Sequence, residues 1–440
     1  MMIHRTIGCR IAFALGVSLV TVLAGCGGAP QLMPTPNLYT RGDVNPFLGV
    51  SEDLQNNKVE VVYATDRVPE DKTPDHVQYG YKRSRSVGFG VSEVRFGKDV
   101  SWADLVKAST SKKREVDLTE TIPRTTELGR FQPTPRSLIQ LTGSADDAAA
   151  SDAAEKATED QFRKLLADQL AHTRVKEVFL FVHGYNNTFK DSVRTIAEVW
   201  HFMGREGVPV AYTWPAGSGG LLRGYTYDRE SSEFTVYHLK QMLRLIASCP
   251  EVTKVHVIGH SRGTDVVTSA IRELHLEISG GGKTARQVLK FGTLVLAAPD
   301  LDIDVMIQRN STARIGQVAE RSAIYVCASD NALGFSSFLF GGLNRLGKLK
   351  SDLFSPQELE ALRNSKTTQI IDARVSDSGA FGHDYFHSNP AVSSDLILLM
   401  RYGFATGAEN GRPLRVDKKG FWVIDDDYPG PQIKPLEDVE

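Results

Sequence analysis

The stretch KVHVIGHSRGTDVV, from Lys254 to Val267, decides the fold of this chain. An apolar run ends here in two glycines that bracket Ser261, and a helical pattern follows at once. The order Gly-x-Ser-x-Gly is that of a nucleophile elbow, a strained turn from strand to helix that exposes the serine hydroxyl. Glycines suit both flanking positions because the two backbones pass too close for side chains. The pattern alone is weak, so its surroundings must decide.

Apolar runs and helical patterns alternate on both sides of this stretch. This alternation predicts βαβ units, and therefore an α/β chain with a mostly parallel central sheet and helices on both faces. The expected strands are 59–65, 86–96, 175–182, 208–213, 252–258, 291–297, 323–328 and 368–375. The expected helices are 152–172, 190–204, 232–248, 264–278 and 356–364.

A second motif follows the strand predicted at 175–182. It reads His183-Gly184-Tyr185-Asn186. Backbone N–H groups aimed at a developing oxyanion can stabilise an acyl-transfer transition state by several kcal/mol. We expect one donor to be the N–H of Arg262, the residue after the serine, and the other to come from the Gly184–Tyr185 turn.

A serine hydroxyl is a weak nucleophile at neutral pH, so it needs a base and a group that orients the base. When a serine of this kind follows a central strand, the acid and then the histidine are expected later in the chain. Asp330 follows the strand predicted at 323–328, and His383 follows the strand predicted at 368–375 on a glycine-containing loop. The predicted triad is therefore Ser261, Asp330 and His383.

Each partner of the serine has a rival. Asp300 ends the strand predicted at 291–297 and is the alternative acid, because triads are recognised by geometry and the acid can move between strands. His387 is the alternative base, but the Ser388-Asn389-Pro390 that follows it is typical of the approach to a helix. Asp330 and His383 are the preferred assignments.

Seven stretches give the chain a resemblance to a bacterial family of uncharacterised α/β-hydrolases, a domain of unknown function. Together they span most of the chain, although each alone is weak. The resemblance implies the α/β-hydrolase fold and serine-hydrolase machinery, without a substrate. The stretches are YATDR (63–67), VHGYN (182–186), YTWPAGS (212–218), IGHSRG (258–263), AAPDLD (297–302), SDNAL (329–333) and GHDYF (382–386).

The N-terminus has the pattern of an export signal. Two arginines precede an uncharged apolar run at 11–23, which is too short to span a bilayer comfortably. The run ends in Leu-Ala-Gly-Cys26, which resembles the bacterial lipoprotein processing box. We expect Cys26 to carry fatty-acyl chains such as palmitate, because several chains on one residue anchor a protein stably. The expected location is the cell envelope, and Gly27 is compatible with the periplasmic face of an outer membrane.

These patterns divide the chain into four parts. They are a lipoprotein signal peptide (1–25), a proline-containing membrane tether (26–57), an α/β-hydrolase domain (58–405) and a polar C-terminal tail (406–440). The apolar segment 333–349 could form a lid over the serine or pack into the core, and core packing is the preferred interpretation. Trp214-Pro215 either lines the site or packs beneath it.

Composition excludes some classes of function. The net charge of −2 argues against a nucleic-acid partner, which would favour a basic face. Of the four cysteines, Cys249 and Cys327 would remain as buried small side chains rather than a disulfide framework. The acidic run 425–427 has no histidine partners, so neither a metal nor a cofactor is expected.

The first functional hypothesis is an exported, lipid-anchored serine hydrolase that cleaves small carboxylic esters through an acyl-enzyme. One alternative is an acyltransferase, in which an alcohol or amine replaces water. The other is a non-catalytic envelope lipoprotein that uses the same scaffold for binding, because fold does not imply function.

Overall fold

A computed structural model gives the structure of the protein. It describes residues 29–40, 44–73, 76–135, 145–219, 221–313, 315–328, 330, 333, 345–349, 355–365, 367–376, 383–417 and 420–430. The predicted signal peptide and the predicted lipidation site at Cys26 lie outside these residues. Among the helices of the described ranges, none is both long and apolar enough to cross a bilayer.

A mostly parallel sheet forms the centre of the molecule, which confirms the predicted α/β class. Its strands follow the order β12-β13-β9-β8-β7-β6-β4-β5-β1-β2-β3, and the neighbours from β13 through β1 all pair in parallel. The parallel strands are β1 (Lys58–Lys72), β4 (Glu177–Val182), β5 (Val208–Thr213), β6 (Lys254–His260), β7 (Phe291–Ala297), β8 (Arg321–Val326), β9 (Thr368–Arg374) and β13 (Trp422–Asp425).

The strand order reverses at β4. The chain passes from β4 to β5 on one side and then returns to β6 on the other side of β4. A crevice opens outside the carboxyl ends of parallel strands at such a switch point, and ligands bind there in open α/β sheets. His183 follows β4 and Ser261 follows β6, so the fold places both predicted motifs at this point.

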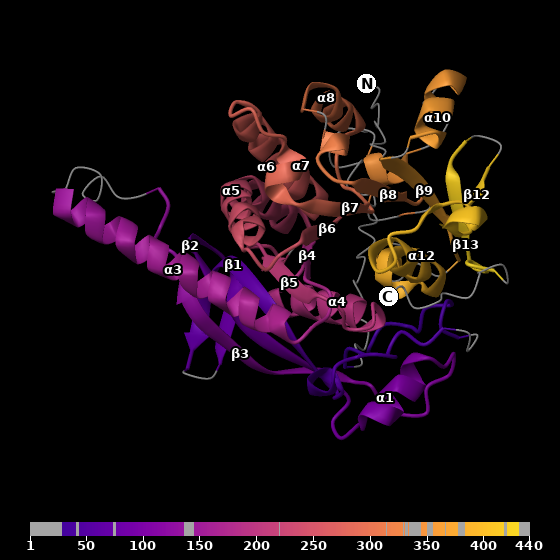
Figure 1. Ribbon diagram of the computed structural model, residues 1–440, viewed down its shortest axis with the longest axis horizontal. Helices are drawn as coiled ribbons and strands as arrows, with labels where there is room; N and C mark the ends of the chain where they lie inside the picture. The colour runs from indigo at the N-terminus through magenta and orange to yellow at the C-terminus, as the bar shows by residue number, and fades with distance from the viewer. Residues whose placement is uncertain are drawn as a thin grey trace, which may run out of the picture.

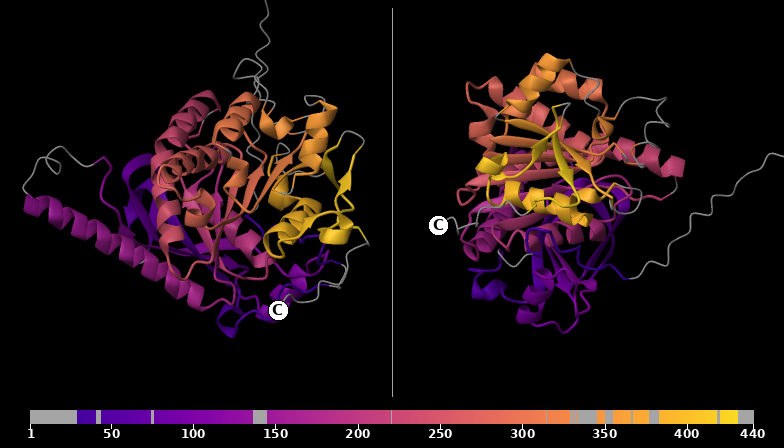
Figure 2. Two further views of the ribbon diagram at one scale, coloured as in Figure 1. Left: turned by 45° about the horizontal axis from the view of Figure 1, so that its top comes forward. Right: turned by 90° about the vertical axis from the view of Figure 1, so that its right-hand side faces the viewer.

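Helices cover both faces of the sheet (Figures 1 and 2). Successive residues of β4 enter opposite cores: Phe179 packs on one face and Leu180 on the other. A strand buried on both faces reads as a continuous apolar run, which is why these strands were predictable. One face carries α1 (Trp102–Ser109), α4 (Phe189–Phe202), α11 (Tyr385–Ser388) and α12 (Pro390–Met400), and the other carries α3 (Ala145–Ala171), α5 (Leu221–Ser248), α6 (Gly263–Ser279), α7 (Ala285–Leu289) and α8 (Ile303–Ala313). Helix α10 (Pro356–Arg363) precedes β9.

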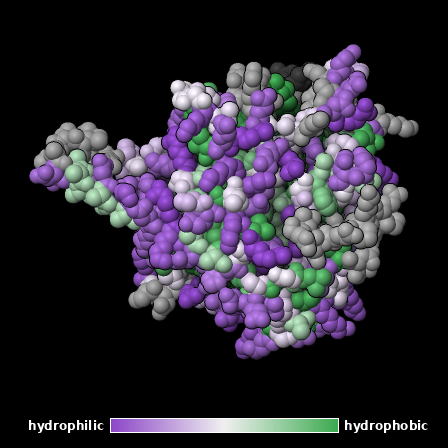
Figure 3. Space-filling model, viewed as in Figure 1, coloured by the Kyte–Doolittle hydropathy of each residue, from purple (hydrophilic) through white to green (hydrophobic). Residues whose placement is uncertain are grey.

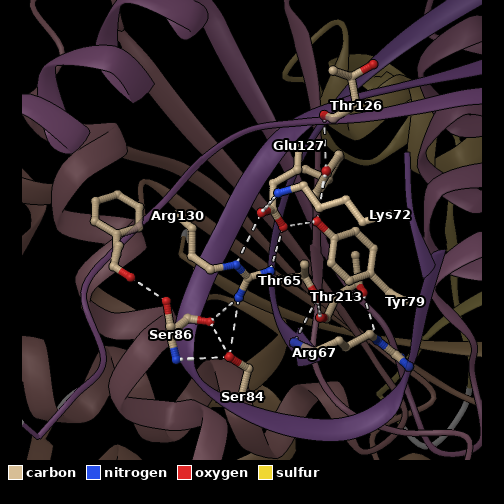
Figure 4. Close-up of polar contacts among 12 residues, drawn as sticks. Thr65, Arg67, Lys72, Tyr79, Ser84, Ser86, Thr126, Glu127, Arg130 and Thr213 are labelled. Carbon is tan, nitrogen blue, oxygen red and sulfur yellow. Dashed lines mark hydrogen bonds and ion pairs between the residues drawn. The ribbon is translucent and has the colours of Figure 1, made fainter. Parts of the chain in front are cut away.

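Three long strands extend one edge of the sheet. Beside β1 lie the antiparallel strands β2 (Val77–Phe96) and β3 (Glu120–Arg130), so the strands predicted at 59–65 and 86–96 are only parts of longer ones. The buried side chain of Glu127 on β3 joins all three strands (Figure 4). It accepts a hydrogen bond from Tyr79 Oη at 2.5 Å and pairs with Lys72 Nζ at 3.0 Å. The pKa of this carboxyl is lowered, because these bonds and Arg130 outweigh its burial.

Helix α3 begins at Ala145, earlier than the predicted start at 152. Its second half packs through Phe162, Leu166 and Leu170 into the core. Its first half projects from the body in both views (Figures 1 and 2). The described side chains of this half, from residue 146 to 158, are exposed or half-buried, so the expectation of a solvated first half is confirmed. Figure 3 shows this end in pale green and hydrophilic purple.

The predicted tether is wrong for its described part, because residues 29–40 and 44–57 are folded onto the domain. Leu32, Met33, Leu38 and Tyr39 are each at most 4% exposed. Asn37 Nδ2 also donates hydrogen bonds to the carbonyl oxygens of residues 426 and 428, which ties the start of the chain to its end. The apolar side chains of this segment follow no helical or strand period, so they gave no local signal.

The predicted polar tail is also wrong as far as residue 430, apart from residues 418–419, which the structure does not describe. Strand β13 adds to the sheet by parallel pairing with β9, and β12 (Arg415–Val416) pairs with β13. Arg412 forms a fully buried ion pair with Asp395 of α12 at 2.6 Å. The short strands β10 (Ala405–Thr406) and β11 (Gly411–Arg412) come before β12 in the chain. The hydrolase domain therefore extends well beyond residue 405.

Candidate active site

Ser261 lies at a strained turn between β6 and α6. Its φ is +51°, in the left-handed region that side chains other than glycine rarely adopt. A methyl group at Gly263 would lie 2.4 Å from the carbonyl oxygens of residues 182 and 183, so this position requires glycine. Thr264 then turns the chain into α6, where its N–H and Oγ1 both donate to the Ser261 carbonyl. The geometry is that of a nucleophile elbow.

The turn after β4 lies directly against this serine. A methyl group at Gly184 would be 2.6 Å from Ser261 Cβ and 3.2 Å from its Oγ. The N–H of Gly184 donates to Asn187 Oδ1 at 3.3 Å, so Gly184 supplies space at the site while its own N–H is already engaged. The N–H of Arg262 donates to no described residue, as expected at the start of a helix. Tyr185 follows Gly184 at the same turn.

The predicted base and acid are in direct contact. His383 Nδ1 donates to Asp330 Oδ2 at 2.6 Å. The Asp330 side chain is fully buried, and its other oxygen accepts the N–H of Leu333. Burial lowers the pKa of His383, but the hydrogen bond and charge of Asp330 outweigh it, so the pKa is raised above 6.5. With Nδ1 protonated, Nε2 keeps its lone pair for accepting a proton.

His383 lies next to the serine-bearing strand. The ring of His260 is 4.9 Å from the His383 ring, and His260 Nε2 donates to the His383 carbonyl at 3.3 Å. Burial and His383 lower the pKa of His260 to about 3, so its ring is neutral. Ser261 and His383 are both described; the bond of the His383 ring is the one to Asp330, and no hydrogen bond joins Ser261 Oγ to that ring. Such contacts are often long in substrate-free enzymes and tighten when the substrate binds.

The alternative acid, Asp300, is engaged elsewhere. Its carboxylate accepts a hydrogen bond from Tyr225 Oη at 2.6 Å and faces Arg345 Nε at 3.3 Å. The nearby Arg262 guanidinium is buried, but the charge of Asp300 raises its pKa. Asp300 thus stabilises cations beside the elbow, whereas Asp330 contacts the histidine.

The alternative base, His387, faces a different partner. It lies on α11, where its Nδ1 is 3.6 Å from Glu198 Oε2 on α4. Burial lowers its pKa. His387 therefore belongs to a buried cluster behind the site, and His383 is the histidine that pairs with an acid at the crevice.

Sequence reasoning missed the residues that hold the turn after β4. Arg67, on β1, and Asp228, on α5, both bond to the backbone of this turn. Arg67 was noticed only as part of a motif, and Asp228 carried no signal. Trp214 is fully buried and stacks on His183 with ring centroids 5.0 Å apart, so it packs beneath the site.

Part of the predicted surroundings lies outside the described residues. This holds for Ser329, Asn331, Gly382 and most of the segment 333–349. Within that segment, Leu333, Leu346 and Leu349 are buried. Among the residues with described positions, no three His, Cys, Asp or Glu side chains gather as a metal site requires.

The sheet with its switch point and the elbow with its histidine–aspartate pair define the class of α/β hydrolases. The chain belongs to the family described as "Alpha/beta hydrolase of unknown function (DUF900)", which matches residues 158–401, more than half of the chain. The match contains six of the seven motifs, all but YATDR (63–67), and it confirms the family resemblance and the assignment as a hydrolase.

Among solved structures, the chain is similar to one named as a candidate cell surface hydrolase from Lactobacillus plantarum WCFS1. The identity is 11%, the match covers 52% of this chain and 91% of that one, and the TM-score is 0.29. No curated protein matches the chain.

Proposed function

We propose that the protein is a serine hydrolase that cleaves carboxylic esters through an acyl-enzyme. The single observation that carries the proposal is the 2.6 Å contact between His383 Nδ1 and Asp330 Oδ2, at the same sheet edge as the elbow serine. A nucleophile, a base and an orienting acid at a switch-point crevice are what acyl transfer requires.

Each residue has one chemical task in this proposal. Ser261 Oγ attacks the acyl carbonyl while His383 Nε2 takes its proton, and Asp330 stabilises the imidazolium without being protonated. The N–H groups of Arg262 and Tyr185 bind the oxyanion. His383 then protonates the leaving alcohol and activates the water that releases the acid.

Fluorophosphonate labelling of the purified protein tests this proposal. Labelling and hydrolysis of nitrophenyl esters are expected in the wild type, to be lost in Ser261→Ala and His383→Ala, and to be kept in His387→Ala, the matched histidine control. A folded wild-type protein that neither labels nor hydrolyses any ester would overturn the proposal. Product analysis with a competing alcohol reports whether the acyl group goes to water or to another acceptor.

We also propose that Cys26 carries the lipid that holds the enzyme in the cell envelope. The support is the sequence alone: a short uncharged apolar run followed by Leu-Ala-Gly-Cys. In cells fed a clickable palmitate analogue, the wild type is expected to take up label and to remain with the membranes. Cys26→Ser should lose both properties while keeping the specific activity, and label that persists in this variant would contradict the proposal.

A further inference from the structure

The turn from His183 to Asn187 is held by two buried charged residues that do not belong to it. The first is Arg67 at the carboxyl end of the segment of β1 that pairs with β5. Its side chain is 1% exposed. The guanidinium donates to the carbonyl oxygens of Asn187 at 2.9 Å, Ala216 at 2.8 Å and Gly80 at 2.9 Å (Figure 4 shows its bond to Thr213).

Arg67 makes these bonds without a carboxylate as direct partner. Asp66 and Asp228 act on its guanidinium through their charge, but neither forms an ion pair with it among the described contacts. Burial lowers its pKa to about 10, and it remains charged at neutral pH. A buried cation that is held only by neutral groups, here backbone carbonyls, Thr213 Oγ1 and His183 Nε2 at 3.3 Å, is costly to keep. Arg67 joins three backbone segments through the carbonyl oxygens of residues 80, 187 and 216.

The second residue is Asp228 on α5, which is 1% exposed. Its Oδ2 accepts the N–H of Asn186 at 2.8 Å and the N–H of Gly217 at 3.2 Å. Its Oδ1 is buried and has no hydrogen-bond partner among the described residues. Asn186 needs this support because its φ is +56°.

The two residues bind the same pair of loops, one as a hydrogen-bond donor and the other as an acceptor. Arg67 binds the carbonyl oxygens at 187 and 216, and Asp228 binds the N–H groups at 186 and 217. The loop after β5 is thereby joined to the turn after β4. Gly184 lies in contact range of Ser261, so this turn directly borders the serine. A small rotation of the turn would change the direction of its N–H groups relative to the serine.

We propose that Arg67 and Asp228 are positioning residues that aim the N–H of Tyr185 at the oxyanion. This inference rests on the proposed function. Neither residue touches substrate, so neither is a catalytic residue. Oxyanion donors act in the transition state, and displacement of one by about 1 Å can cost about 100-fold in rate. Loss of either residue therefore lowers kcat and leaves KM nearly unchanged.

The experiment compares Arg67→Lys and Arg67→Met with Arg205→Lys. Arg205 is a matched control, because it is also 1% exposed and donates to the neutral carbonyls of Leu54 and Lys58. It lies between α4 and β5, near the amino ends of the parallel strands, whereas Arg67 lies near their carboxyl ends. Kinetics on a nitrophenyl ester are measured with each variant, together with binding of a boronate that mimics the tetrahedral intermediate.

We expect kcat to fall about 10- to 100-fold in Arg67→Met, with the boronate affinity falling in parallel and KM changing less than about threefold. Arg205→Lys should lose stability and keep kcat. Equal kcat losses at both positions, or a loss in KM alone, would overturn the inference.

Asp228 gives an independent measurement if the Arg67 variants do not fold. Asp228→Asn keeps an oxygen acceptor for the two N–H groups, whereas Asp228→Ala keeps none. The alanine variant should lose kcat and boronate affinity, and the asparagine variant should recover most of both. If Asp228→Ala folds and keeps full kcat, the inference fails. Wild-type protein without esterase activity or labelling would instead be a failure of the proposed function.

Discussion

The site has no room for even a methyl side chain at Gly184. The space beside Ser261 is filled to contact distance, and a Cβ at this position would lie 2.6 Å from Ser261 Cβ. Nucleophile and oxyanion turn must both keep their positions for acyl transfer. A substitution at Gly184 should therefore affect the activity more than the stability of the protein.

The first prediction concerns Gly184→Ala. Ester hydrolysis should fall by about 100-fold or more, because either the serine or the turn must shift. The control is Gly292→Ala on β7, where the added methyl would meet the His256 ring at 2.8 Å, away from the serine. Both variants should lose about 1–3 kcal/mol of stability, measured by urea unfolding. Comparable activity in the two variants would contradict the assigned geometry.

The second prediction uses the raised pKa of His383. A base must be neutral to take a proton, so kcat/KM should rise with pH through a pKa above 6.5. In Asp330→Asn this acid limb should move to lower pH, because the carboxylate that raised the pKa is gone, and kcat should drop about 1,000-fold or more. Asp300→Asn should move the limb far less. A pH–rate profile of the three proteins checks this, and a larger shift in Asp300→Asn would reverse the assignment of the acid.

At the scale of elements, a carboxyl pair connects β3, α4 and the N-terminal segment. Glu120 and Glu198 are hydrogen-bonded to each other, and Glu198 also accepts the N–H of Met33 at 2.6 Å. Arg194 lies 4.0 Å from Glu120, and His387 lies 3.6 Å from Glu198. Burial raises the pKa of Glu120 from 4.5 to about 7, and burial and Glu120 raise that of Glu198. The pair thus holds a proton in the folded protein.

The third prediction follows from this proton. Unfolded glutamates ionise near 4.5 while the folded pair resists ionisation, so the stabilisation present at acid pH is lost as the pH rises from about 4.5 to about 7. Urea unfolding across this range should show a falling free energy of unfolding. Glu120→Gln should flatten the dependence, whereas Glu159→Gln on the exposed side of α3 should not. A slope unchanged in Glu120→Gln would show that the pair carries no shared proton.

Elements differed in how far the sequence predicted them. The central parallel strands and the three residues of the proposed triad follow local rules, since apolar runs mark these strands and chemistry is placed at their carboxyl ends. Arg67 and Asp228 act through contacts that join positions more than 40 residues apart, and a single sequence contains no sign of these pairings. The N-terminal segment and β13 were missed because their apolar residues are too few to make a period.

At the scale of the whole molecule, the start and the end of the described chain complete one core. Leu38 donates its backbone N–H to Ser394 of α12, and Arg401 donates to the carbonyl of Pro46. The described residues 29–40 and 44–57 therefore bridge α12 and the rest of the domain. They are structural rather than a spacer.

The fourth prediction concerns truncation. A chain that begins at Ala29 should fold and label with a fluorophosphonate. A chain that begins at Asn57 lacks the four deeply buried side chains of residues 32–39. Each contributes about 2–5 kcal/mol to the free energy of unfolding, and together they rival the stability of a domain. This shorter chain should aggregate or melt far lower, as seen by circular dichroism and gel filtration. Two equally stable proteins would contradict this account of the segment.

The bond from the Glu120 N–H to the Pro30 carbonyl is 2.7 Å long, and it has a consequence for the proposed lipid anchor. It secures the chain only four residues after Cys26, and four residues reach at most about 14 Å. If Cys26 is acylated as proposed, the folded body is held close against the bilayer, with little freedom to turn or to sample the compartment. Esters presented near the same surface would then meet the enzyme far more often than freely diffusing ones.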